Sequence, residues 1–273
     1  MTTISVFNNK GGVGKTSLTV NLAAALGKRR EREHILVMDC DAQNNAAEYL
    51  MRYSISLGDI PEKPLTICDY LDGSCELNDI VYNASFKEGR KTIKSTIDAI
   101  ASGKDINHVD FSSLDVYKNM ISELSKEYDY CFIDCPPQTV DTALAAINAA
   151  DYILIPITTE NDSSFSGYNM AIDLINQFRD AGVNDIVKIL GVVITKTKDN
   201  RSSLEGYFRE QAEDIFGDLL FKTAIREAQA VNEAFVFRNP VVYYKKNAPV
   251  ANDYKKLANE FVKRIDKAEG KVF

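Results

Sequence analysis

The sequence predicts an α/β protein built on a doubly wound, mostly parallel β-sheet that is flanked by helices. Short apolar runs alternate along the chain with segments of helical period, which is the pattern of a parallel sheet covered on both faces. A glycine-rich segment at residues 11–14 follows the first apolar run, and acidic residues end two later runs. Open sheets of this kind bind ligands at the carboxyl ends of their strands.

Five apolar runs are predicted to form strands, and a further run is a candidate sixth. The strands are Thr3–Asn8, Ile35–Asp39, Tyr130–Asp134, Tyr152–Pro156 and Ile186–Ile194, and the candidate lies around Leu219–Thr223. Apolar residues recur with a period of about 3.6 in several segments between them. Helices are therefore predicted at Lys15–Lys28, Thr139–Ala149, Gly167–Phe178, Leu204–Phe216 and Val250–Ile265.

Residues 10–16 read Lys-Gly-Gly-Val-Gly-Lys-Thr and lie between the first strand and the first helix. The segment has the spacing of a phosphate-binding P-loop, with Asn9 in place of the first glycine. Glycines allow several backbone N–H groups to point at one anion at a helix N-terminus. Lys15 is expected to bind the β- and γ-phosphates, and the Thr16 hydroxyl to bind Mg²⁺. The predicted nucleotide-binding residues of this P-loop NTPase fold are Lys10, Gly11, Gly12, Val13, Gly14, Lys15, Thr16 and Ser17.

The lysine at position 10 carries a resemblance to a known family. A lysine at this place is the signature of the deviant Walker A ATPases of the ParA/Soj/MinD group, and the chain most resembles a small ParA-type plasmid or chromosome partition ATPase. The resemblance implies ATP and Mg²⁺ as cofactors and slow hydrolysis of ATP to ADP and phosphate. It also implies an ATP-dependent homodimer that encloses the nucleotides, in which Lys10 reaches the phosphates bound by the other subunit.

Acidic residues end two of the predicted strands. Asp39 and Asp41 follow one apolar run, and strand alternation places both on the same side of the chain. By resemblance, Asp41 orients the attacking water and Asp39 supports it; for either one alone, a solvated or helix-capping aspartate is an equally good interpretation. Asp134 ends a strand that resembles Walker B, and the Asp-x-Pro-Pro that begins there resembles the second switch. The predicted catalytic residues are Lys10, Lys15 and Asp41, and the predicted metal ligands are Thr16, Asp39 and Asp134.

The stretch from about residue 51 to 127 departs from the alternating pattern. It contains two prolines and several glycines, and short helices are predicted at Ile67–Leu71, Thr92–Ile100 and Leu114–Ser125. The chain contains neither an internal repeat nor a low-complexity linker, so residues 1–273 are predicted to form a single domain. Its nucleotide core comprises residues 1–50 and 128–195, its elaboration residues 51–127, and its C-terminal helical part residues 196–273.

The composition indicates a cytoplasmic protein. The chain has 273 residues, of which 45% are hydrophobic and 26% charged, enough for one good core. No apolar run approaches the roughly 18–20 residues of a membrane span, and a predicted core strand stands where a signal peptide would lie. The cysteines are expected to be reduced, because Cys40, Cys131 and Cys135 lie in or beside apolar runs.

The partition role that the resemblance implies requires binding to nonspecific DNA, which the net charge of −7 opposes. Local charge governs phosphate binding, however. Residues 196–273 contain 15 Lys and Arg against 12 Asp and Glu, a balance of +3, whereas residues 1–195 contain 17 against 27, a balance of −10. The predicted DNA-binding residues are Lys196, Lys198, Arg201 and Arg226, and a further basic cluster consists of Lys87, Arg90, Lys91 and Lys94.

The favoured interpretation is an ATP-dependent dimerising switch ATPase for the partition of plasmid or chromosome DNA. By resemblance, it binds nonspecific DNA in the ATP state, which associates it with the nucleoid, and a centromere-binding partner protein of the ParB type stimulates the hydrolysis that releases it. A metabolic P-loop enzyme is another class of interpretation, but the sequence shows no recognisable second substrate pocket.

The alternative is a MinD-like, membrane-associated ATPase of cell division and positioning. Leu257, Phe261 and Ile265 belong to an apolar stripe surrounded by lysines near the end of the chain, as in an amphipathic helix that lies on a bilayer. A helix that covers the core of the protein requires the same stripe. For this stripe, the helix that covers the core is the favoured interpretation, and no membrane partner is predicted.

Overall fold

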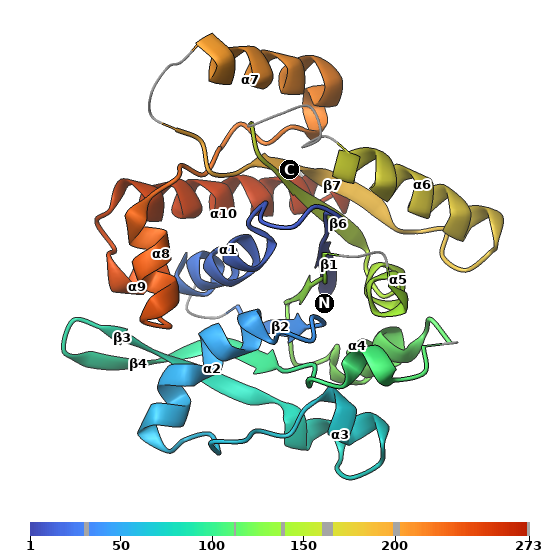
Figure 1. Ribbon diagram of the computed structural model, residues 1–273, viewed down its shortest axis with the longest axis vertical. Helices are drawn as coiled ribbons and strands as arrows, with labels where there is room; N and C mark the ends of the chain where they lie inside the picture. The colour runs from blue at the N-terminus through green and yellow to red at the C-terminus, as the bar shows by residue number, and fades with distance from the viewer. Residues whose placement is uncertain (30–32, 112, 138–139, 160–165, 199–202, 272–273) are drawn as a thin grey trace.

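The computed structural model describes residues 1–29, 33–111, 113–137, 140–159, 166–198 and 203–271, and in this part of the chain a seven-stranded sheet forms the centre (Figure 1). The strand order is β3-β4-β2-β5-β1-β6-β7, and all neighbours are parallel except β3 and β4. The strands are β1 (Thr2–Val6), β2 (Ile35–Asp39), β3 (Tyr82–Glu88), β4 (Lys91–Ile100), β5 (Tyr130–Asp134), β6 (Tyr152–Ile157) and β7 (Lys188–Ile194).

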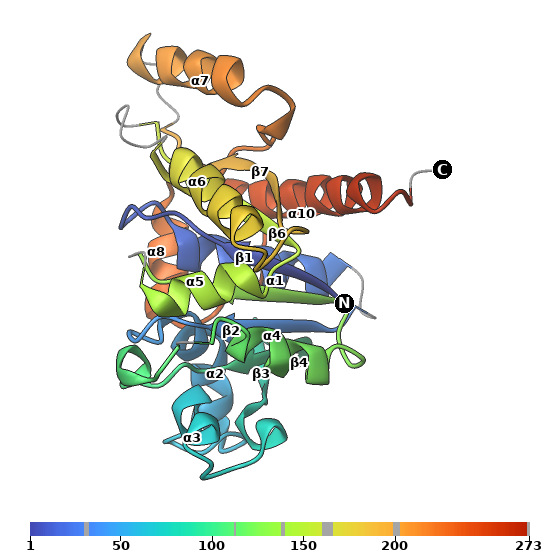
Figure 2. The ribbon, with the colours of Figure 1, turned by 90° about the vertical axis from the view of Figure 1, so that its right-hand side faces the viewer.

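Helices pack on both faces of this sheet, which therefore lies between two apolar cores (Figures 1 and 2). One face is covered by α1 (Lys15–Arg29), α2 (Asn45–Leu57), α9 (Val241–Tyr244) and α10 (Pro249–Ala268). The other is covered by α4 (Val116–Leu124), α5 (Asp141–Asn148) and α6 (Ser166–Asp180). The remaining helices are α3 (Ile67–Leu71), α7 (Ser203–Phe216) and α8 (Gln229–Val236), with 3₁₀ turns at Leu77–Ile80, Ile106–His108 and Gly217–Leu219.

The fold class predicted from the sequence is confirmed, and the five predicted strands are β1, β2, β5, β6 and β7. Every residue of β1, β2 and β5 is buried, because these central parallel strands have helices on both faces. That burial explains why they stand out in the sequence as short, almost continuous apolar runs. All five cysteines are free, and Cys40, Cys131 and Cys135 are buried.

The helix predicted at Thr92–Ile100 is wrong, because these residues belong to β4. Ile97 and Ala99 are fully buried while Asp98 between them is partly exposed, which is strand alternation. The strand pairs antiparallel with β3, and Gly89, with a φ of 62°, takes the left-handed conformation in the turn between them. No helix or strand was predicted for the residues of β3, α2, α8 or α9.

The candidate sixth strand around Leu219–Thr223 is also wrong. Leu220 forms a single bridge to Val192 of β7 and directly follows the 3₁₀ turn at Gly217–Leu219. The guanidinium of Arg264 donates hydrogen bonds of 2.9, 3.2 and 2.6 Å to the carbonyls of residues 218, 219 and 220. These carbonyls are bound by a side chain of α10, so they do not continue a strand ladder.

The apolar stripe near the end of the chain is buried on the sheet by α10. Leu257, Phe261 and Ile265 are at most 1% exposed, and the Phe261 ring centroid lies 5.6 Å from that of Tyr130 and 5.5 Å from that of Phe132 on β5. The stripe covers the core, so its interpretation as a membrane anchor is wrong. Among the helices of the described residues, none has both the length and the apolar character needed to cross a bilayer.

Phe261→Ala tests the role of α10. Removing a fully buried ring that packs on two aromatic residues should lower the free energy of unfolding by about 3–5 kcal/mol, through lost burial and the cavity that remains. Urea unfolding followed by circular dichroism measures this change. Lys263→Ala on the exposed side of the same helix is the matched control, with an expected change within about 0.5 kcal/mol. Equal stability of the two variants would show that the stripe is not part of the core.

Candidate nucleotide-binding site

The glycine-rich loop joins the end of β1 to the start of α1 and opens at the carboxyl edge of the sheet (Figure 1). Gly12 and Gly14 have φ angles of 77° and 87°, in the left-handed region that a residue with a Cβ rarely adopts. Leu18 N–H donates to the Gly14 carbonyl at 2.8 Å, which starts the first turn of α1. The loop therefore directs backbone N–H groups and the helix N-terminus at one place, as anion binding requires.

Asn8, which ends the first predicted strand, holds the loop to the rest of the sheet. Its fully buried amide donates to the Pro156 carbonyl of β6 at 2.8 Å, and its Oδ1 accepts from Lys10 N–H at 2.9 Å. The neighbouring α6 is in contact at Gly167, where an added Cβ would lie 2.3 Å from the Asn8 amide. The conformation at Lys10 is thus fixed by a contact that only glycine allows.

Lys15 is buried at the base of the loop. Its ammonium donates to the carbonyl of Asn8 at 2.9 Å and to that of Lys10 at 3.2 Å. Burial lowers the pKa of Lys15, while the carboxylates of Asp134 and Asp41 act in the opposite direction. The charge is therefore held among backbone dipoles, at the position from which it can neutralise a phosphate.

Asp134 lies beneath the start of α1 and is fully buried. Its Oδ2 accepts from the Thr16 hydroxyl at 2.7 Å, and its Oδ1 from the Thr19 hydroxyl at 3.2 Å. Burial raises the pKa of Asp134 to about 6, although these hydrogen bonds and the charge of Lys15 lower it. The structure thus brings the predicted metal ligands Thr16 and Asp134 into direct contact.

Asp39 and Asp41 occupy different environments. Asp39 is fully buried, and its Oδ2 accepts from the N–H groups of Ala46 and Ala47 at the start of α2, at 2.8 and 3.0 Å. Burial and the neighbouring Asp134 carboxylate raise the pKa of Asp39 well above its ordinary range. Asp39 therefore caps a helix, as one sequence interpretation allowed, and its role as a metal ligand stays a prediction. Asp41 is partly exposed at the cavity described next.

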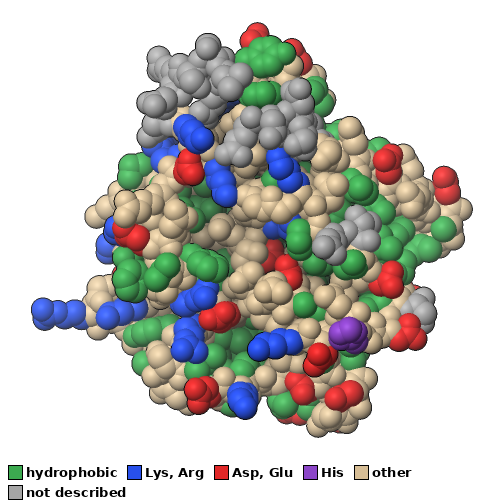
Figure 3. Space-filling view, in the orientation of Figure 1, with side chains coloured by type: hydrophobic (Ala, Val, Ile, Leu, Met, Phe, Trp, Pro, Cys, Tyr) green, Lys and Arg blue, Asp and Glu red, His purple; other side chains and the backbone are tan. Residues whose placement is uncertain are grey.

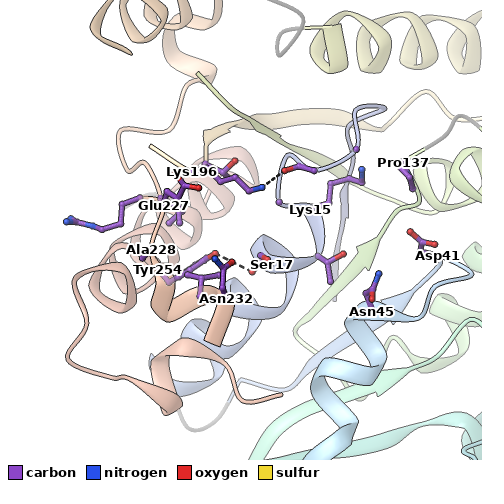
Figure 4. Close-up of a pocket in the computed structure, with 18 residues that line it drawn as sticks. Lys15, Ser17, Asp41, Asn45, Pro137, Lys196, Glu227, Ala228, Asn232 and Tyr254 are labelled. Atoms are coloured by element: carbon purple, nitrogen blue, oxygen red, sulfur yellow. Dashed lines mark hydrogen bonds between the residues drawn. The ribbon is translucent and has the colours of Figure 1, made fainter. Parts of the chain in front are cut away.

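A cavity of about 490 Å³ opens beside the loop (Figure 4). It is lined by six of the eight predicted nucleotide-binding residues, Gly11, Gly12, Gly14, Lys15, Thr16 and Ser17, together with Asp41, Asn45 and Pro137. Lys10 and Val13, the other two, do not line it. Figure 4 shows Asp41 and Asn45 on one side of the cavity and Asn232 and Tyr254 on the other. The space between them opens directly beside the glycine-rich loop.

The wall that includes Asn232 was not predicted from the sequence as part of this site. It consists of Thr195, Lys196, Ile225, Arg226, Glu227, Ala228, Val231, Asn232 and Tyr254. Residues 225–227 pair with the end of β7, through hydrogen bonds of 2.8 Å from Ile225 N–H to the Ile194 carbonyl and from Glu227 N–H to the Thr197 carbonyl. This pairing joins segments about 30 residues apart, so no local sequence motif predicts it.

The residues predicted to bind DNA have other partners where the structure describes them. The Lys196 ammonium donates to the Gly12 carbonyl of the P-loop at 2.6 Å, so it lies at the nucleotide cavity. Arg226 forms a two-pronged ion pair with Asp253, at 2.6 and 3.1 Å. Lys198 is exposed, and Arg201 lies outside the described residues. The DNA contacts of these four residues stay predictions, and the geometry of Lys196 and Arg226 points to other roles.

A glycine-rich loop that holds a buried lysine above a strand-ending carboxylate places the protein in the class of P-loop nucleotide-binding proteins. Residues 1–189 match the family model described as an AAA domain. The chromosome-partitioning ATPase Soj of Treponema pallidum is 29% identical over 96% of this chain and 97% of its own. The sporulation initiation inhibitor protein Soj of Bacillus subtilis is 30% identical over 94% and 96%. The chain belongs to the ParA/Soj/MinD family of P-loop ATPases.

The solved structures agree with this assignment. The septum site-determining protein MinD of Pyrococcus horikoshii, determined in complex with Mg-ADP, superimposes with a TM-score of 0.72. It is 25% identical in sequence, and the match covers 98% of this chain and 97% of that one. The similarity extends over nearly the full length of the chain, so it includes the elaboration between β2 and β5 as well as the P-loop.

Gly167→Ala tests whether α6 holds the P-loop in place. The new Cβ would overlap the buried Asn8 amide, so Asn8 must move and release the backbone at Lys10. We expect the dissociation constant of a fluorescent ATP analogue to rise at least about tenfold, and stability to fall by about 1–3 kcal/mol. Gly206→Ala in α7 is the matched control, because no atom lies within 4 Å of its added Cβ. Unchanged affinity for the ATP analogue in Gly167→Ala would show that α6 does not hold the P-loop in place.

Asp134→Asn tests the buried charge in metal-free protein. The folded pKa of about 6 lies above the ordinary value of about 3.9, so between these pH values the folded protein keeps a proton that the unfolded chain has released. Stability contributed by the protonated group is fully present below pH 4 and is lost as the pH rises through about 6. Urea unfolding in EDTA should therefore show the variant to be about 1–3 kcal/mol more stable than wild type at pH 7.5, with no difference below pH 4.

The exposed Asp185→Asn controls for the change of overall charge and should leave stability unchanged. An Asp134→Asn variant less stable than wild type at both pH values would mean that the ionised carboxylate stabilises the metal-free fold.

Proposed function

We propose that this protein is an ATPase that dimerises on binding ATP and acts in the partition of DNA. The observation that carries the proposal is the separation of two P-loop lysines: Lys15 lines the nucleotide cavity, whereas Lys10, five residues earlier in the same loop, does not. A second lysine of the loop that does not line this cavity suits a role across a dimer interface. There it would neutralise the triphosphate bound by the other subunit.

Thr16, which lines the cavity, and Asp134, which accepts its hydroxyl hydrogen bond, fit Mg²⁺. Thr16 offers a hydroxyl and Asp134 a carboxylate, which are the hard oxygen ligands that this cation prefers. Asp134 and Asp39 lie opposite each other on neighbouring strands, and burial raises the pKa of both carboxylates. A divalent cation beside them would relieve this excess of buried negative charge. When bound, Mg²⁺ supplies positive charge to the phosphate oxygens.

The other residues of the site suit the positioning that phosphoryl transfer requires. Lys15 holds the phosphates together with the N–H groups of the glycine loop. Asp41 lines the cavity and accepts a hydrogen bond from Gln43 N–H at 2.9 Å through one oxygen, so its other oxygen is available to orient a water molecule. With the phosphates at the loop, the base of the nucleotide would face the wall that includes Val231, Asn232 and Tyr254. The Asn232 amide has both the donor and the acceptor that a purine edge needs.

The partition role is supported by the relatives. The Soj of Treponema pallidum is a chromosome-partitioning ATPase by name, and it matches this chain over nearly its full length. We propose that the ATP-bound dimer binds nonspecific DNA and that a centromere-binding partner protein accelerates the hydrolysis that releases it. The protein would then be cytoplasmic and associated with the nucleoid in its ATP state.

Light scattering of the purified protein with ADP, ATP and a non-hydrolysable ATP analogue tests the proposal. Lys15→Ala should lose nucleotide binding. Asp41→Ala should bind ATP, remain dimeric and hydrolyse at least about 10²-fold more slowly. Lys10→Ala should bind ATP in a monomer and lose hydrolysis, while Lys118→Ala on the exposed side of α4 should behave as wild type. A wild-type protein that stays monomeric when saturated with the analogue would refute the dimer.

A further inference from the structure

The hairpin of β3 and β4 ends in a tip that projects from the edge of the sheet (Figure 1). Residues 87–94 of this tip read Lys-Glu-Gly-Arg-Lys-Thr-Ile-Lys and contain the four cations Lys87, Arg90, Lys91 and Lys94. We propose that this tip, called the basic arm below, is a DNA-binding element whose four cations contact backbone phosphates. The inference rests on the proposed function, since it assigns a site to the DNA that the ATP-bound dimer holds.

The four cations of the basic arm are all exposed to solvent. In the described part of the chain none of the four side chains forms a hydrogen bond or an ion pair. Figure 3 shows Lys and Arg side chains gathered at this projecting edge of the molecule. An ammonium or guanidinium that is not already paired can release counterions from DNA at no loss of an internal contact.

Two lysines outside the arm compensate the negative charge of Glu88, the only acidic residue of the arm. Lys28 at the end of α1 donates to Glu88 Oε1 at 2.7 Å, and the Lys246 ammonium lies 3.4 Å from the same atom. The hydrogen bond from Lys28 lowers the pKa of Glu88, so the carboxylate is ionised and compensated. The potential at the tip is therefore set by four positive charges, in a chain with a net charge of −7.

The arm is held in place and is not a loose loop. β3 is the edge strand of the sheet, and the Asn239 side chain pairs with its exposed edge by accepting from Lys87 N–H at 3.2 Å and donating to the Lys87 carbonyl at 2.8 Å. Phe86 packs on Tyr243 with ring centroids 4.8 Å apart. Thr92 and Tyr53 of α2 share a hydrogen bond of 3.0 Å. A supported two-stranded ribbon presents its cations at low entropic cost and is of a width that the major groove admits.

A second basic surface, called the lysine groove below, lies on another side of the molecule. It has a volume of about 910 Å³ and is lined by the exposed lysines 188, 222, 256, 263 and 267. The carboxylates of Asp218 and Glu260 also line it, as do Leu190 and Leu219. A concave surface with an apolar floor and internal carboxylates is less suited to a phosphate backbone than a projecting arm. Substitutions in the lysine groove therefore serve as the matched control for substitutions in the basic arm.

The arm accounts for the dependence of DNA binding on ATP. Four phosphate contacts correspond to a slope of about −3.6 in a plot of log affinity against log salt, which is weak binding at physiological ionic strength. A dimer carries two arms in one body, so the second contact forms at a high effective concentration. The slope then approaches about −7, and affinity rises steeply without any change in the arm itself.

The test compares full-length proteins in the presence of a non-hydrolysable ATP analogue. The arm variant carries Lys87→Ala, Arg90→Ala, Lys91→Ala and Lys94→Ala, and the groove variant carries Lys256→Ala, Lys263→Ala and Lys267→Ala. Fluorescence anisotropy with a labelled random-sequence duplex measures affinity at several salt concentrations. We expect the arm variant to bind at least 100-fold more weakly, with a salt slope reduced by about 4–7, and the groove variant to bind as wild type.

Dimerisation and basal ATP hydrolysis should be unchanged in the arm variant, because none of its four residues lines the nucleotide cavity. If the fourfold variant fails to fold, Arg90→Ala at the turn should still reduce the slope by about 1–2. A folded arm variant with the wild-type slope and affinity overturns the inference, whatever the groove variant does. A wild-type dimer that binds no DNA even at low salt instead refutes the DNA part of the proposed function.

Discussion

The burial of two carboxylates side by side is the constraint on which the rest of this structure depends. Asp39 and Asp134 end neighbouring central strands and are opposite each other in register, in the interior of the protein. Each unpaired buried charge would cost several kcal/mol, so the surrounding residues must supply compensation. Asp39 receives it from three backbone N–H groups, and Asp134 from two hydroxyls and the charge of Lys15. The nucleotide edge of the sheet is organised by these contacts.

The same compensation links the P-loop to elements far away in the sequence. Asp39 positions the start of α2, which carries Asn45 into the cavity, and Asp134 positions Thr16 at the start of α1. Asn8 adds a third link, to β6 and α6. A ligand that brings positive charge to Asp134 therefore acts on the junction of β1, β2, β5 and β6 at once. Burial raises the pKa of both carboxylates, so their ionised forms work against the stability of the fold, and strain of this kind is a common property of functional sites.

The central strands, the P-loop and the acidic strand ends could be predicted from the sequence because each depends on local signals. A strand buried on both faces is an apolar run, and a phosphate loop has fixed glycine spacing. Helix capping was one interpretation of Asp39, but the helix that it caps, α2, could not be predicted, since Asp39 bonds residues seven and eight positions later, across a loop. The wall with Asn232 depends on the pairing of residues 225–227 with β7, and β4 depends on its partner β3. Contacts between residues that are distant in the sequence, and not local patterns, determine these elements.

The relation between the nucleotide and the basic arm follows from the rigidity of α1. This helix begins at Lys15 and ends next to Lys28, about 20 Å away, where it holds Glu88 of the arm. Near that end α1 is in tight contact with β4, because a Cβ added at Gly27 would lie 3.0 Å from Thr96 Oγ1. A buried, closely packed helix moves as a unit with the sheet, so it gives the nucleotide no means of opening or closing the arm. Under the proposed function, control by ATP therefore acts on the number of arms in one body, through dimerisation.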